Sequence, residues 1–131
     1  MKIAIFILTL LVSNSVMADW EFVSRDPDDK LVSYADKSTR TKEWFGNTTM
    51  WSLFDFRYAF NANGMMVRSI KRLVEYDCKN KTIKTLTEIY HPKLMGGGTP
   101  VGIKNRNQGD DDVLNVPPGS LHSHLLDTAC E

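Results

Sequence analysis

Two cysteines, the only ones in the chain, constrain what this sequence can fold into. Cys78 shares its parity with Ile70 and Val74 in a run typical of a β-strand with one buried face. Cys130 ends an apolar stripe at helical spacing that includes Leu121 and Leu125. A bond between the two sulfur atoms would hold that predicted helix across one face of a sheet.

The N-terminal residues predict a secretory signal peptide. A lysine at position 2 precedes an apolar stretch over residues 3–12, and a polar segment then leads to a small-residue cleavage site ending on Ala18. We expect a signal peptide over residues 1–18, cleaved after Ala18, and one domain over residues 19–131. The alternative interpretation of the apolar stretch is a buried N-terminal helix or strand.

The same stretch argues for an exported chain without a membrane span. About ten apolar residues are too few to cross a bilayer, which takes about 20. No cysteine follows directly to accept a lipid anchor, and no second apolar run of membrane length occurs. We therefore expect the processed protein to be periplasmic or secreted.

Export bears on how the two cysteines are used. In an oxidising compartment they are most simply interpreted as one disulfide. A Cys78–Cys130 bond would close a loop of about 53 residues, for which the loop-entropy model gives at most roughly 4 kcal/mol. The alternatives are two free thiols or an intermolecular bond. A metal site would need the paired cysteine spacing that zinc sites use.

The net charge of the processed chain gives no reason to expect a polyanionic partner. Of the 16 basic and 16 acidic residues, cleavage removes only Lys2, which leaves one net negative charge. We expect no binding to nucleic acid or to an anionic membrane surface.

Alternating apolar residues predict a single sheet. Strands are expected over residues 20–24, 31–36, 49–60, 66–78, 82–90 and 113–116. Short turns join the three long central strands into an antiparallel meander. Residues 38–47 are interpreted as a turn or irregular link, and Ser120 as the N-cap of the final helix. The predicted fold is α+β: one antiparallel sheet of about five to six strands, with a C-terminal helix packed on one face and tethered by a disulfide.

No motif of the sequence predicts a catalytic, cofactor-binding or metal-binding residue. His122 and His124 lie two apart, so a helix would point them in different directions, and we expect both to be exposed. Residues 110–112 are three aspartates without the alternate ligand spacing of a calcium loop. The glycines of residues 96–98 lack the Lys-Ser or Lys-Thr of a phosphate-binding loop and predict a flexible loop.

Two further features remain open. Arg68 and Arg72 share one strand face, where they either bind a carboxylate or another anion or cover the sheet margin with their aliphatic stems. Asn47 and Asn80 begin triplets that match the N-glycosylation pattern, which has meaning only in a eukaryotic source.

Several short segments together resemble a known family across nearly the whole predicted domain. They are Trp20, Tyr34-Ala35-Asp36 with Ser38-Thr39-Arg40, Trp51-Ser52-Leu53, Ser69 and Lys71, Glu75-Tyr76-Asp77-Cys78, Pro117-Pro118-Gly119-Ser120 and Ala129-Cys130. In these the chain is similar to the surface-adhesin protein E-like family of exported bacterial proteins. The resemblance implies an antiparallel sheet with a C-terminal helix held by the disulfide. For the founding member it also implies adhesion to host matrix proteins and a homodimer.

These observations lead to two hypotheses of function. The first is an exported, non-enzymatic binding module of the bacterial envelope, adhesin-like, that uses the exposed sheet face or the loops over residues 93–112. The alternative is a structural or accessory periplasmic protein that acts by dimerising or by binding another envelope protein. Either way we expect a protein partner, from the host matrix or the envelope, and no cofactor.

Overall fold

The computed structural model of the protein describes residues 18–106 and 113–131. The predicted signal peptide up to residue 17 and the aspartates at 110–112 lie outside the described residues. The elements are β1 (Glu21–Arg25), β2 (Leu31–Lys42), β3 (Thr48–Ala62), β4 (Met65–Asp77), β5 (Thr82–His91), the 3-10 turn η1 (Leu94–Gly96), β6 (Gly102–Asn105), β7 (Val113–Asn115) and α1 (Leu121–Ala129).

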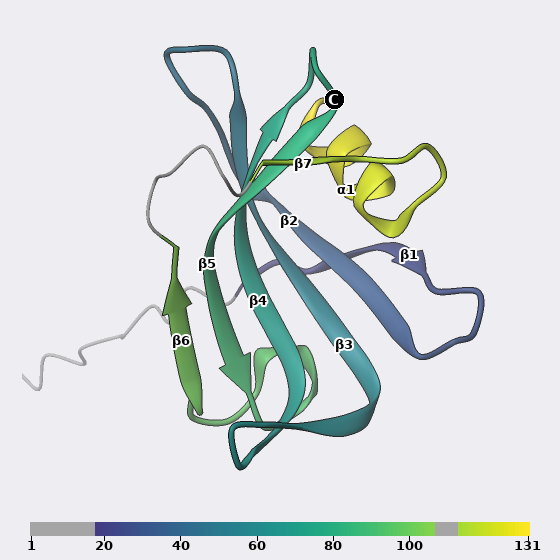
Figure 1. Cartoon of the computed structure of the whole chain (residues 1–131), viewed down its shortest axis with the longest axis vertical. Helices are drawn as coiled ribbons and strands as arrows, with labels where there is room; N and C mark the ends of the chain where they lie inside the picture. Colours follow the sequence, from purple (N-terminus) through teal and green to yellow (C-terminus); the bar gives the residue numbers. More distant parts are fainter. Residues whose placement is uncertain (1–17, 107–112) are drawn as a thin grey trace, which may run out of the picture.

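All seven strands form one antiparallel sheet whose order follows the chain. Strands β1 to β6 lie side by side in sequence order, and β7 pairs with β5. The sheet is strongly twisted, and the chain from β7 crosses it to reach α1 (Figure 1). The predicted fold class, an antiparallel sheet with a C-terminal helix tethered by a disulfide, is confirmed.

Strand β2 is longer than the sequence predicts, so the interpretation of residues 38–47 as a turn or irregular link was wrong over its first half. The β2–β3 ladder is interrupted between Asp36 and Thr41, and the hydroxyl of Thr39 takes the place of a backbone acceptor there. The Thr39 hydroxyl accepts from the backbone N of Trp51 at 3.0 Å and donates to the carbonyl of Asp36 at 2.7 Å. Because of these bonds, polar residues extend the strand instead of ending it.

The region after β5 holds two elements that the sequence does not predict. A 3-10 turn forms at Leu94–Gly96, with Gly96 in the left-handed region at φ 67°. Strand β6 then pairs with β5 through Ile103 and Ile89. With only four residues, one of them glycine, β6 is too short to show a period in its own sequence.

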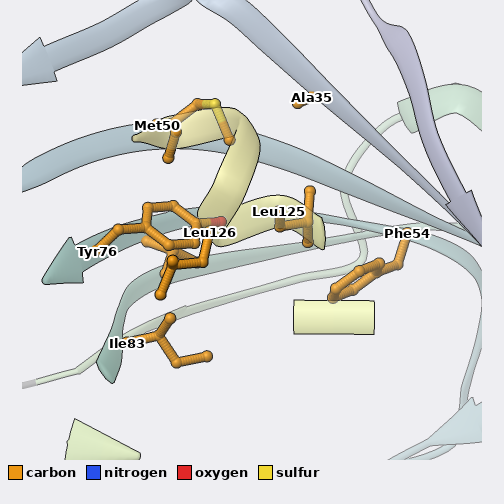
Figure 2. Packing of buried hydrophobic residues seen from close by; sticks show 9 residues of the cluster. Ala35, Met50, Phe54, Tyr76, Ile83, Leu125 and Leu126 are labelled. Atoms are coloured by element: carbon orange, nitrogen blue, oxygen red, sulfur yellow. The ribbon is translucent and has the colours of Figure 1, made fainter. Parts of the chain in front are cut away.

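The helix packs on β1, β2 and β3 and completes the core. Ser120 caps it as predicted, because its side chain accepts from the backbone N of Ser123 at 3.2 Å. Figure 2 shows Leu125 and Leu126 among Met50 and other buried side chains of the sheet. Both leucines are 1% exposed, and such burial contributes about 1.5–3 kcal/mol for each side chain.

A disulfide joins the helix end to the sheet. Cys78 directly follows β4, Cys130 directly follows α1, and their Cα atoms lie 5.8 Å apart. Within the described ranges, no helix is long and apolar enough to cross a membrane.

Candidate functional site

The two faces of the sheet differ, because α1 covers only one of them. Successive side chains of a strand point to opposite faces. In β3, Met50 and Phe54 belong to the core beneath the helix, so Trp51, Leu53 and Asp55 point the other way. We call this second side the helix-free face.

A trough of about 280 Å³ lies on the helix-free face. Half-buried apolar side chains form most of its wall, among them Trp51 of β3 and Ile89 of β5. The chain before β1 crosses the middle of the sheet (Figure 1) and adds Trp20. The lining consists of Ala18, Trp20, Asp36, Thr39, Trp51, Lys71 and Ile89.

Two charged side chains take part in this lining. Asp36 is 5% exposed, and its Oδ1 accepts from the backbone N of Ser38 at 3.1 Å and from the Ser38 hydroxyl. Lys71 is half-buried beside Gly96, where a Cβ would lie only 2.4 Å from the lysine Cε. Among the ion pairs of the described residues none involves Lys71.

Beyond the trough, three buried polar side chains form a row across the same face. Asp55, Ser69 and His91 lie directly opposite one another on β3, β4 and β5. The three side chains bind the backbone of residues 93–98. The backbone N of Met95 donates to Asp55 Oδ1 at 2.8 Å. The Ser69 hydroxyl donates to the carbonyl of Lys93 at 2.6 Å.

The glycine-rich segment is therefore anchored to the sheet, whereas the sequence predicted a flexible loop. Ser69 also accepts from the backbone N of Gly96 at 2.9 Å, and His91 Nδ1 lies 3.2 Å from the carbonyl of Gly98. Burial raises the pKa of Asp55 and lowers the pKa of His91, which keeps both groups closer to their neutral forms. A row of Asp, Ser and His suggests a hydrolytic triad, but the Ser69 hydroxyl is already committed to the loop.

The structure also places the two arginines that the sequence left open. Arg72 lies on the helix side, with its guanidinium carbon 4.9 Å from the centre of the Phe54 ring and its Nη2 3.7 Å from Glu88 Oε1. The carboxylate it binds is thus within the chain. Arg68 donates from Nε to the carbonyl of Phe56 at 3.1 Å. Neither guanidinium enters the trough.

The helix histidines are used differently from each other. His124 is exposed as predicted. The expectation for His122 was wrong: its ring packs edge-on against Phe54 with 5.9 Å between centroids, and burial lowers its pKa. In the described part of the chain no group of three or more His, Cys, Asp or Glu residues could hold a metal ion.

A separate apolar feature marks the β2–β3 turn. The Trp44 side chain is 93% exposed and Phe45 is 50% exposed. Their rings pack edge to face with centroids 5.3 Å apart. Trp44 and Phe45 are thus an exposed apolar surface outside the trough, and a substitution there can serve as a control for substitutions in the trough.

Sequence reasoning named the exposed sheet face but missed the trough itself. Trp51 and Lys71 come from different strands and meet in the trough through the β3–β4 register, in which Leu53 lies opposite Lys71. One signal was available in the sequence. Apolar residues of both parities in residues 49–60 indicate a central strand, or one whose outer face meets a partner.

Comparisons with known proteins agree with this architecture. The sequence model of the family described as surface-adhesin protein E matches residues 20–131. Crystal form II of Haemophilus influenzae protein E superposes with a TM-score of 0.60 at 10% identity, covering 83% of this chain and 86% of that one. A second structure of that protein gives 0.57 at 10% identity with 83% of each chain covered. Protein E from a non-typeable strain gives 0.53 at 11% identity, covering 89% of this chain and 76% of that one. No curated protein sequence shows a significant match.

Proposed function

Because the chain belongs to the surface-adhesin protein E family, we propose that it is an exported, non-enzymatic binding module of the bacterial envelope. The proposal includes removal of residues 1–18 after Ala18 and a periplasmic or secreted location. It also includes a protein partner, from the host matrix or the envelope, bound at the trough of the helix-free face.

The observation that supports this proposal is the composition of the trough. A half-buried wall that contains Trp20, Trp51 and Ile89 suits a large apolar side chain of a partner. Lys71 beside that wall suits a carboxylate on the same partner segment. The best-fitting ligand is therefore a protein segment in which an aromatic or aliphatic residue lies next to an acidic one.

The state of the polar row supports a non-enzymatic role. A serine nucleophile needs its hydroxyl hydrogen-bonded to a base. The Ser69 hydroxyl instead donates to the carbonyl of Lys93, and His91 Nδ1 faces the carbonyl of Gly98. Both side chains hold a loop in place, which is a structural use of residues that could otherwise do chemistry.

Binding measurements on residues 19–131 test the proposal. The purified chain is passed over immobilised host matrix proteins and is also used to capture partners from envelope extract. Trp51→Ala should weaken the principal interaction at least about tenfold, as for a central aromatic anchor. Lys71→Glu should weaken it as well, and this change leaves the apolar wall intact. Circular dichroism and urea unfolding verify that each variant is folded.

Trp44→Ala is the matched control, because it removes an exposed tryptophan outside the trough. Retained binding in both trough variants, with loss in Trp44→Ala, would show that the trough is the wrong surface. Stoichiometric capture of one envelope protein without matrix binding would favour the accessory role over adhesion. Hydrolytic activity that disappears in Ser69→Ala would contradict the non-enzymatic assignment. Sedimentation of the free chain tests the homodimer that the resemblance implies.

A further inference from the structure

The backbone nitrogen of Asp19 lies at a buried carboxylate. It donates to Asp36 Oδ2 at 3.2 Å, and Asp36 is 5% exposed. The other oxygen, Oδ1, is already occupied by Ser38 through its backbone N and its hydroxyl. Thus one oxygen of this carboxylate faces the chain just before β1.

This buried negative charge has no cation in contact within the described residues. Lys37, the next residue of β2, pairs with Glu21 at 3.5 Å and with Glu131 at 3.3 Å. Lys71 lines the same trough as Asp36 but takes part in no ion pair among the residues that the structure describes. A buried carboxylate held only by neutral donors gains more from a cationic donor at the same place.

Cleavage after Ala18 would create such a cation. Hydrolysis adds water across the Ala18–Asp19 peptide bond, which leaves a carboxylate on Ala18 and an amine on Asp19. An α-amine has an ordinary pKa of about 7.7–8.0, so it takes up a proton at neutral pH. The atom that donated as a neutral amide to Asp36 then donates as an ammonium.

From this geometry we infer that removal of the signal peptide installs an ion pair between the α-ammonium of Asp19 and the carboxylate of Asp36, and opens the trough by removing Ala18 from its lining. The inference rests on the proposed cleavage and on the proposed role of the trough. In the processed chain the α-ammonium of Asp19 balances the charge of Asp36. Lys71 is then the charged group of the trough that meets a partner's carboxylate. Processing thereby completes the binding site.

Three charged groups surround the new terminus and decide its titration. Asp36 of β2 lies closest, Lys71 of β4 lines the same trough, and Asp19 contributes its own carboxylate beside its own amine. The contact with Asp36 should raise the pKa of the α-amine above that of an exposed terminus.

The test compares four forms of the processed protein: wild type and Asp36→Asn, each with a free and with an acetylated N-terminus. Intact-mass analysis of the exported chain first establishes whether it begins at Asp19, and any other first residue overturns the inference. The processed chain is then compared with the same chain acetylated on the Asp19 nitrogen, which restores a neutral amide without adding a residue. An Asp36→Asn variant is prepared in both forms.

We expect the α-amine to titrate at a higher pH than an unpaired terminus, and acetylation to lower the urea midpoint only when Asp36 is present. Equal midpoints for the acetylated and free forms, or equal losses with Asp36→Asn, would overturn the ion pair. If Asp36→Asn does not fold, the NMR titration of the α-amine in the wild type decides alone. The two proposals fail separately. If Trp51→Ala loses partner binding but acetylation does not change the urea midpoint, only the ion pair is overturned. If acetylation lowers the midpoint but Trp51→Ala still binds the partner, only the role of the trough is overturned.

Discussion

The guanidinium of Arg72 lies 4.9 Å from the centre of the Phe54 ring, on the helix side of the sheet. From there it forms an ion pair with Glu88, and Glu88 accepts hydrogen bonds from Arg106 at 3.1 Å and from the hydroxyl of Tyr90 at 2.9 Å. Burial pushes the pKa of Glu88 upward, but these partners together hold it below its ordinary value. The guanidinium of Arg72 thus connects its own strand, β4, with Phe54 of β3 and Glu88 of β5.

Arg72→Leu should destabilise the protein at neutral pH by about 1–3 kcal/mol, because it leaves a buried carboxylate with fewer partners. A carboxyl whose folded pKa is depressed contributes stability above its unfolded value, near 4.3, and loses that contribution as the pH falls. The difference between wild type and variant in urea unfolding should therefore shrink between pH 7 and pH 3. Arg57→Ala, which breaks an exposed pair with Asp29, is the control and should change little.

Loss of the disulfide should lower the free energy of unfolding by more than Arg72→Leu does. Cys78 and Cys130 are 52 residues apart in sequence, and removing a native bridge from a small domain typically costs about 2–5 kcal/mol. Cys130→Ser should lower the urea midpoint, and reduction of the wild type should lower it by a similar amount. If both sulfurs of the exported wild-type protein react with an alkylating agent without reductant, the bridge is absent in the cell.

Buried histidine should make the protein less stable in mild acid. The pKa of His91 is lowered by burial, so the unfolded chain binds more protons below about pH 6.5 and stability rises with pH through this range. Stability should thus fall as the pH is lowered from 7 to 5. Burial lowers the pKa of His122 as well, so His91→Asn should make this dependence shallower without removing it. A curve that keeps its slope in His91→Asn would refute this assignment.

Gly98 should tolerate no side chain. Its φ is +77°, and a Cβ there would lie 2.8 Å from Pro92 Cγ, so we expect Gly98→Ala to cost about 1–2 kcal/mol. Gly102→Ala is the matched control, because its Cβ would meet the Tyr90 ring at an ordinary 3.5 Å. Thermal unfolding of the two variants gives the comparison. Equal losses would mean that the loop adapts around Gly98.

Much of the fold was accessible from the sequence because burial repeats along it. The shared parity of Met50 and Phe54 predicts β3 and its buried face, and Ser120 marks the start of α1. The end of β2 was misjudged because Thr39 looks like a turn residue, whereas in the structure its hydroxyl substitutes for a ladder bond. That use of a side chain depends on which residue lies across the sheet.

The site was less accessible, for the same reason. The meeting of Trp51 with Lys71 depends on the strand register, and the place of Trp20 depends on how the chain enters β1. The row of Asp55, Ser69 and His91 is likewise an outcome of register, since the three residues come from three strands. Local patterns predict the class of the long strands and of the helix, but contacts between strands are set by the assembled sheet.

The order of the strands has a consequence for how the molecule is assembled. Each strand from β1 to β6 pairs with its neighbour in the chain, so hairpins can form one after another as successive segments become available. The helix is synthesised after all of them, yet it packs on β1, β2 and β3. The first part of the sheet to form is thus the last to be covered, and its exposed apolar surface is open to aggregation during that delay.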